Sequence, residues 1–224
     1  MAKHETSWTL IHSAQAGDAR ARDEFARLYG PVVRAYFAAR WQAPPLENEI
    51  DDAVQEVFVD CLRADGALGR SDPNRPFRPF LFGVARTVAL RFEQRLGRRD
   101  TDELDEQGLR ARETRLSVAF DRAFAVQVMR EATGLQRAHA RTDGGVKLRR
   151  VELLELRFER GLSILEIAKL WGEDAARVHH MYSDAREDFR SALREVVGER
   201  IGVAPADLER ECEWMLEVLR PSRD

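Results

Sequence analysis

The sequence predicts an all-α protein of two small helical domains, which are joined by a charged linker and followed by a helical tail. Three observations lead to this prediction. The 224 residues are rich in Ala, Leu, Arg and Glu, all good helix formers. Apolar residues recur at the spacing of one helix face. Glycine and proline are sparse and fall mostly between these apolar segments, where they mark turns.

The N-terminal part predicts a series of short helices. A first helix is expected from Trp8 to Ala16, with Gly17 at its end. A second is expected after Asp18, a good N-cap residue, and Gly30 is expected to end it. Pro31 stands where a third helix would begin, because the first position of a helix tolerates the missing N–H of proline.

Two charged segments of opposite sign follow. Residues 46–60 contain six acidic and no basic residues and form a clearly periodic helix. Residues 78–99 contain six arginines and one acid, Glu93, within the next expected helix. The net charge of −3 argues weakly against nucleic-acid binding, but two surfaces of opposite sign indicate two different partners. The boundaries expected from this pattern are a first domain at 1–96 and a linker at 97–115, which has only two Leu and no aromatic residue.

The second domain is expected at 116–197, and its strongest signal is LSILEIAKLWGEDAARVHHMYSDAR (162–186). Ser163 and Glu166 have the spacing of a capping box at the start of a helix. Gly172 supplies a tight turn, and Asp174 caps the following helix. This order of features predicts a helix-turn-helix, for which a plain pair of packed helices is the alternative. The tail at 198–224 is expected to contain an amphipathic helix.

Three stretches carry a resemblance to a known family. They are EIDDAVQEVFVDCL (49–62), FRPFLFGVARTVALRFEQRLGRR (77–99) and LRFERGLSILEIAKLWGEDAARVHHMYSDAREDFRSAL (156–193). In this order they resemble regions 2 and 4 of the extracytoplasmic-function (ECF) group of the sigma-70 family of RNA polymerase sigma factors. The match spans residues 6–96 and 147–196. It implies an initiation factor that binds core RNA polymerase and promoter DNA, and that performs no covalent chemistry.

The resemblance also implies roles for individual residues. The acidic helix would dock on the polymerase through Asp51, Asp52, Gln55 and Glu56. The loop and basic helix after it would contact the opened −10 element through Asn74, Arg78, Arg86, Arg91, Arg95 and Arg98, with Phe80 and Phe82 as aromatic faces. The second helix of the helix-turn-helix would contact the −35 element through Arg177, His179, His180, Ser183 and Arg186.

This chain departs from the family pattern in two places. Met181 and Asp184 replace cations of the recognition helix, and Asp184 would repel phosphate, so weak −35 binding is expected. The tail helix, with Trp214 and Met215, is expected to pack on the second domain or to bind a regulator. The resemblance implies a partner of that kind, such as an anti-sigma protein or a kinase, and a monomeric free state.

Two other classes of function remain as alternatives. The first is a degenerate helix-turn-helix adaptor, which would bind a protein partner with little promoter activity of its own. The second, an enzyme, is disfavoured because the sequence has no Walker loop, GxSxG or CxxC, and neighbouring residues on a helix, such as His179 and His180, point about 100° apart. No cofactor or metal is expected. Two isolated cysteines, no apolar run of membrane-spanning length and no signal peptide predict a reduced, cytoplasmic protein without a membrane segment.

Overall fold

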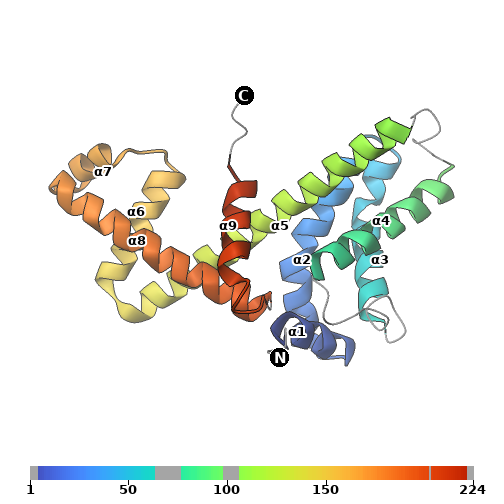
Figure 1. Ribbon diagram of the computed structural model, residues 1–224, viewed down its shortest axis with the longest axis horizontal. Helices are drawn as coiled ribbons and strands as arrows, with labels where there is room; N and C mark the ends of the chain where they lie inside the picture. Colours follow the sequence, from blue (N-terminus) through green and yellow to red (C-terminus); the bar gives the residue numbers. More distant parts are fainter. Residues whose placement is uncertain (1–4, 64–76, 98–105, 202, 221–224) are drawn as a thin grey trace. The chain divides into compact units, whose positions relative to one another are not determined.

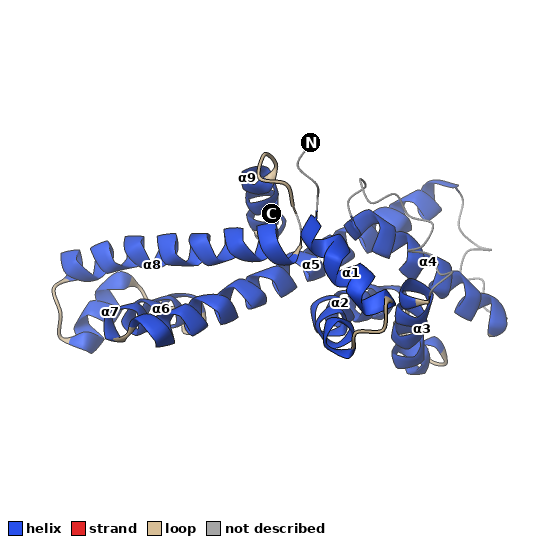
Figure 2. Cartoon of the chain, turned by 90° about the horizontal axis from the view of Figure 1, so that it is seen from below, coloured by secondary structure: helices blue, strands red, loops and turns tan. Residues whose placement is uncertain are grey.

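The computed structural model describes residues 5–63, 77–97, 106–201 and 203–220 (Figure 1). Over these residues the regular elements are helices and no strand occurs, which confirms the all-α prediction (Figure 2). None of the described helices combines the length and apolar character needed to cross a membrane. The elements are α1 (Glu5–Gln15), α2 (Ala19–Arg40), a 3-10 turn η1 (Leu46–Glu49), α3 (Ile50–Leu62), α4 (Phe77–Arg95), α5 (Glu106–Asp143), α6 (Gly145–Phe158), α7 (Ile164–Trp171), α8 (Ala175–Glu195), a π-helical turn η3 (Val196–Arg200) and α9 (Leu208–Val218).

The chain forms two compact units that divide it differently from the prediction. The first unit is Met1–Gln127 together with Glu199–Asp224, and the second is Val128–Gly198. The expected linker at 97–115 is helical over residues 106–115, which form the first turns of α5. Charged turns become ordered here because the apolar residues that follow them, such as Phe120 and Phe124, are buried in the core of the first unit.

Aromatic side chains dominate the core of the first unit. Here α1, α2, α3 and α4 pack against one another, and α5 adds its N-terminal half. The ring of Tyr36 on α2 lies 5.4 Å from that of Phe82 on α4 and 6.4 Å from that of Phe120 on α5. The rings of Tyr29 and Phe124 are stacked at 6.5 Å. Edge and stacked pairs of this kind add about 0.5–1.5 kcal/mol each beyond the burial of their area.

Helix α2 continues through Pro31, where the sequence predicts an end and a new start. A proline inside a helix removes the N–H that would bond to the carbonyl four residues earlier, here that of Arg27. In the structure the side-chain amide of Gln127, on α5, donates to this Arg27 carbonyl at 3.3 Å. Gln127 is buried, so a tertiary contact provides the donor that Pro31 lacks.

The second unit contains the predicted helices and turn, an order that both the helix-turn-helix and a plain pair of packed helices share. Helices α6, α7 and α8 pack on one another around a small core that includes Leu153, Ile167 and Val178. Ala168 and Ala185 complete it, and their small side chains let α7 and α8 approach closely. The order helix, turn, helix over residues 164–195 is therefore confirmed.

The tail contains the predicted amphipathic helix, α9, with Cys212 and Met215 on its buried side. The expectation that it packs on the second domain is wrong, because residues 199–224 belong to the first unit. The Arg78 guanidinium of α4 lies over the Trp214 ring of α9, 3.7 Å from its centre. A guanidinium on an aromatic face is a favourable cation–π pair, which explains why α9 packs against α4 in the first unit.

Replacing Gln127 by Leu is expected to destabilise the protein by about 0.5–1.5 kcal/mol, because the hydrogen bond to the Arg27 carbonyl is lost. In a Pro31→Ala background the same change is expected to cost much less, because residue 31 then supplies its own N–H to Arg27. Urea unfolding of the two single variants and the double variant measures this coupling. Equal costs of Gln127→Leu in both backgrounds would contradict this explanation of the uninterrupted helix.

Candidate nucleic-acid and polymerase interface

The acidic residues at the start of α3 are exposed, whereas Glu56 and Asp60 are only partly exposed. Ala53, Val57 and Cys61 face the core at helical spacing, which leaves Asp52 and Gln55 exposed on the opposite side. Asp51 is also exposed and forms an ion pair with Arg34 of α2. The exposed acidic face is therefore smaller than the sequence predicts, and Asp52 and Gln55 lie at its centre.

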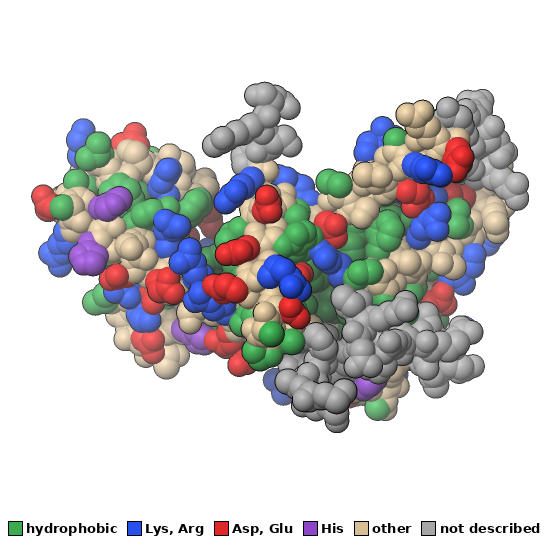
Figure 3. All heavy atoms as spheres, viewed as in Figure 1, with side chains coloured by type: hydrophobic (Ala, Val, Ile, Leu, Met, Phe, Trp, Pro, Cys, Tyr) green, Lys and Arg blue, Asp and Glu red, His purple; other side chains and the backbone are tan. Residues whose placement is uncertain are grey.

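The acidic and basic segments pair with each other, which corrects the expectation of two separate surfaces. Helices α3 and α4 pack side by side, so Glu56 of α3 lies 3.2 Å from Arg91 and 3.1 Å from Arg95 of α4. Asp60 also forms an ion pair with Arg91. Figure 3 shows acidic and basic side chains interspersed rather than segregated on the visible face. Partly exposed pairs of this kind contribute only about 0–1 kcal/mol, so an incoming phosphate can replace the carboxylates.

A groove lies between α3 and α4. Its volume is about 500 Å³, and its walls include Arg63, Phe80, Thr87 and Arg91. An aromatic face beside two cations suits a nucleotide, but Asp60 also lines the groove and pairs with Arg91, so a phosphate must replace this carboxylate. Of the two aromatic faces predicted, Phe80 lines this groove, whereas Phe82 packs in the core against Tyr36 and Phe120.

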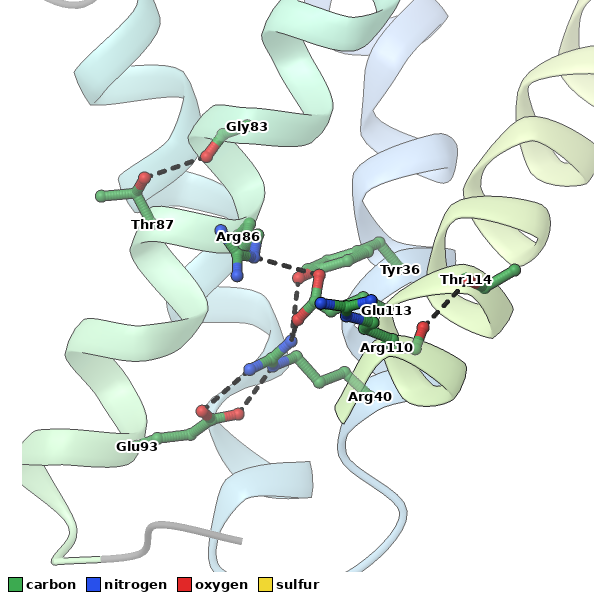
Figure 4. Close-up of polar contacts among 9 residues, drawn as sticks. All are labelled: Tyr36, Arg40, Gly83, Arg86, Thr87, Glu93, Arg110, Glu113 and Thr114. Carbon is green, nitrogen blue, oxygen red and sulfur yellow. Dashed lines mark hydrogen bonds and ion pairs between the residues drawn. The ribbon is translucent and has the colours of Figure 1, made fainter. Parts of the chain in front are cut away.

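Arg86 belongs to a buried polar network that the sequence did not predict. Its Nε lies 3.0 Å from Glu113 of α5, and the other oxygen of Glu113 lies 3.3 Å from Nη1 of Arg40 (Figure 4). Arg40 also donates two hydrogen bonds to Glu93, at 2.7 and 3.0 Å. The indole of Trp41 donates to the same carboxylate at 2.9 Å. The network joins α2, α4 and α5, and Glu93, the single acid of the basic segment, is its centre.

The two charges at the centre of this network are buried, whereas Glu113 and Arg86 at its edge are 32% and 50% exposed. The Arg40 and Glu93 side chains are 1% and 5% exposed. Burial alone would raise the pKa of Glu93, but the hydrogen bonds from Arg40 and Trp41, together with the Arg40 charge, outweigh it and hold the pKa below its ordinary value. Burial raises the pKa of the neighbouring Tyr36 to about 12, so its hydroxyl stays protonated. A buried carboxylate that remains ionised depends fully on its partners.

Arg78 has a different environment from the other arginines of α4. Besides the Trp214 ring, it faces the Phe124 ring at 5.8 Å and the Asp121 carboxylate at 3.3 Å, both on α5. Burial raises the pKa of Asp121, and the Arg78 charge offsets part of that rise. Every arginine of α4 predicted to contact DNA thus has an acidic neighbour in the free protein.

Local capping interactions hold the helix-turn-helix in the second unit. The Ser163 hydroxyl accepts from the Glu166 N–H, while the Glu166 carboxylate accepts from the Ser163 N–H at 2.7 Å, which confirms the capping box. Gly172 ends α7 with a φ of 64°, a left-handed conformation that suits glycine. The Asp174 carboxylate accepts from the N–H groups of Ala176 and Arg177 at the start of α8.

All five predicted DNA-contacting side chains of α8 are exposed, because Val178 and Ala185 occupy its buried side. They are Arg177, His179, His180, Ser183 and Arg186.

The neighbouring acids of α8 are neutralised from within the unit. Arg150 of α6 forms ion pairs with Asp184 and Asp188, and Lys147 lies 3.0 Å from Asp188. The expected repulsion of phosphate by Asp184 is therefore reduced, because its counter-charge comes from α6. Arg177 lies 3.6 Å from Glu173, so the exposed face of α8 is only moderately basic.

The structure does not describe two of the predicted site residues, and three charged residues of the site were not predicted. Asn74 and Arg98 lie outside the described residues. Arg40, Glu113 and Asp121 were missed, since each becomes informative only through a partner on a distant helix. The described residues contain no cluster of His, Cys, Asp and Glu able to hold a metal ion. Both cysteines are buried and neither forms a disulfide, and burial raises the pKa of the Cys61 thiol to about 12.

No known family model matches this chain, and no curated protein matches it either.

Replacing Glu93 by Gln is expected to lower the free energy of unfolding by about 3 kcal/mol, because buried Arg40 then keeps only the partly exposed Glu113 as a counter-charge. Glu106→Gln is the matched control, since its pair with Arg110 is 82% and 78% exposed. Its loss is expected to stay below about 1 kcal/mol. Equal losses in the two variants, measured by urea unfolding, would contradict the proposed importance of the buried pair.

The same pair sets the response to acid. Because folding lowers the pKa of Glu93, the ionised carboxylate stabilises the protein above the ordinary glutamate pKa of about 4.3. This stabilisation is lost as the pH falls below that value and through the lower pKa of the folded state. The free energy of unfolding of the unmodified protein is therefore expected to fall more steeply below about pH 4 than that of Glu93→Gln.

Proposed function

We propose that this protein is a sigma-type transcription initiation factor. In this proposal the first unit binds core RNA polymerase and the opened −10 element, and the second unit binds the −35 element. The protein acts as a monomer in the cytoplasm and forms no covalent intermediate.

The observation that best supports the proposal is the helix-turn-helix of the second unit. Its first helix is capped, its turn contains a left-handed glycine, and α8 exposes all five side chains expected to contact DNA. In a helix-turn-helix the N-terminal part of the second helix enters the major groove, where Arg reads guanine and Ser or His contacts bases or phosphates.

Promoter binding by the first unit would be an exchange of ion pairs. When single-stranded DNA approaches α4, phosphates replace the carboxylates of Glu56 and Asp60 around Arg91 and Arg95. The groove beside Phe80 offers a stacking face to an unpaired base. The exchange costs little because these pairs are partly exposed, and the released counterions of DNA favour it.

A second candidate function is that of an adaptor that binds a protein partner and has little promoter activity. The acidic neighbours of Arg78, Arg86, Arg91 and Arg95 favour this alternative, because a strongly basic DNA-binding surface is absent from the described part of α4. The two candidates differ in whether the protein partner is the polymerase and in whether the chain directs transcription from promoters.

The double variant Asp52→Lys and Gln55→Lys is expected to abolish binding to core polymerase, because it reverses the charge at the centre of the exposed α3 face. It leaves the ion pairs of Asp51 and Glu56 in place, so the fold should be retained. The double variant Glu106→Lys and Gln107→Lys makes the same chemical change on exposed residues of α5 and is expected to bind normally. Pull-down with purified core polymerase measures both, and equal binding by the two variants would refute the α3 docking surface.

A further inference from the structure

Helix α9 covers one of the arginines expected to contact DNA. The Trp214 ring lies 3.7 Å from the guanidinium carbon of Arg78, closer than the Phe124 ring at 5.8 Å. On the buried side of α9, Cys212 and Met215 are 5% and 0% exposed. A guanidinium nitrogen of Arg122, on α5, donates to the Val218 carbonyl at the end of α9 at 3.4 Å. The position of Trp214 on Arg78 is therefore supported by the buried residues beside it and by a contact at the C-terminal end of the helix.

The contacts of Arg78 have the chemistry of a bound nucleotide. An aromatic ring over the guanidinium corresponds to a stacked base, and the Asp121 carboxylate corresponds to a phosphate. Arg stacked on an unpaired base and paired with the sugar–phosphate backbone is a common mode of single-strand binding. In the free protein, Trp214 and Asp121 occupy both of these positions.

Arg78 is incompletely satisfied in this arrangement. Its Nη1 is buried and lies 3.3 Å from Asp121, yet it has no hydrogen-bond partner among the described residues. A buried guanidinium nitrogen without an acceptor destabilises the closed arrangement relative to one in which an acceptor is present. A phosphate oxygen or a base edge is such an acceptor, so the site favours exchange.

The charge of α9 also excludes DNA from Arg78. Residues 207–218 contain five acidic residues and one arginine. An acidic helix over a DNA-contacting arginine repels the phosphate backbone as long as it stays in place. Its aromatic residue and its charge act in the same direction, because the first fills the stacking position and the second repels the competing ligand.

We propose that α9 is an internal competitor of single-stranded DNA, with Trp214 occupying the base-stacking position on Arg78 until DNA displaces it. This inference rests on the proposed function, since it assigns the competing ligand to the −10 strand. The tail is then a built-in restraint on DNA binding by the first unit, and any partner that draws α9 away increases that binding.

Fluorine NMR of the full-length protein labelled with 5-fluorotryptophan tests directly whether DNA displaces Trp214 from Arg78. The sequence has four tryptophans, so the Trp214 resonance is assigned by its disappearance in Trp214→Leu. Addition of a short single-stranded oligothymidine is expected to move the Trp214 resonance towards its position in Arg78→Ala, where the stacking partner is absent. The other tryptophan resonances serve as internal controls.

Affinities for the same oligonucleotide at fixed salt provide the second measurement. Trp214→Leu, which keeps an apolar side chain but removes the aromatic face, is expected to bind about tenfold more tightly, the equivalent of one desolvated cation–π pair. Leu216→Ala is the matched control on the exposed side of the same helix and is expected to bind as the unmodified protein does. Trp214→Phe should restore most of the restraint, and adding Arg78→Ala to Trp214→Leu should remove the gain.

The outcomes separate this inference from the function on which it rests. DNA binding with an unmoved Trp214 resonance, and with equal affinities for Trp214→Leu and Leu216→Ala, would overturn the competitor role and leave the sigma-type proposal standing. Absence of single-strand binding in every variant, Trp214→Leu included, would overturn both.

Discussion

The buried ion pair between Arg40 and Glu93 is the constraint on which the first unit depends. Removing two charges from water is costly, and the pair is tolerated because Arg40 binds both oxygens of Glu93 while Trp41 donates a third hydrogen bond. Glu113 extends the network to α5 and onward to Arg86 at the surface. Three helices are therefore held in one arrangement by groups that lose most of their stabilisation if any partner is removed.

Ion pairs also cover the surface of α4. Arg86 faces Glu113, Arg91 and Arg95 face Glu56, and Arg78 faces Asp121. Among these named pairs and the Arg40–Glu93 pair, only Arg40–Glu93 is buried enough to resist exchange with a ligand. The outer pairs are weak in water, so they lower non-specific attraction to nucleic acid and still yield to a ligand that offers phosphates at the right spacing. The proposed promoter binding uses this difference between a buried pair and its exposed neighbours.

Features encoded locally in the sequence were predicted correctly. The capping box of Ser163 and Glu166, the left-handed Gly172 and the Asp174 cap each act within a few residues, so their spacing alone gives the start, turn and restart of the helix-turn-helix. Asp18 was identified as a cap for the same reason. The outward face of α3 followed from helical periodicity.

Features that depend on distant partners were not predictable from the sequence. Pro31 predicts a helix end, but Gln127, almost a hundred residues later, supplies the missing donor. The charged turns before Leu116 predict a linker, but the aromatic residues after them bury α5 in the first unit. The pairing of Glu56 with Arg91, and the position of Trp214 on Arg78, arise from helix packing that no local pattern records.

Transcription in vitro with purified core polymerase and a library of promoter fragments tests the proposed function most directly. The proposal predicts transcripts from defined start sites that require this protein. Arg91→Ala with Arg95→Ala should lower their yield and reduce the slope of DNA affinity against salt by about 1.4, as expected for two lost single-strand phosphate contacts. Glu56→Gln, which frees Arg95 and leaves Arg91 paired only with Asp60, should raise the affinity of the protein for single-stranded DNA. The same start sites with and without the protein, together with no binding to core polymerase, would contradict the proposal.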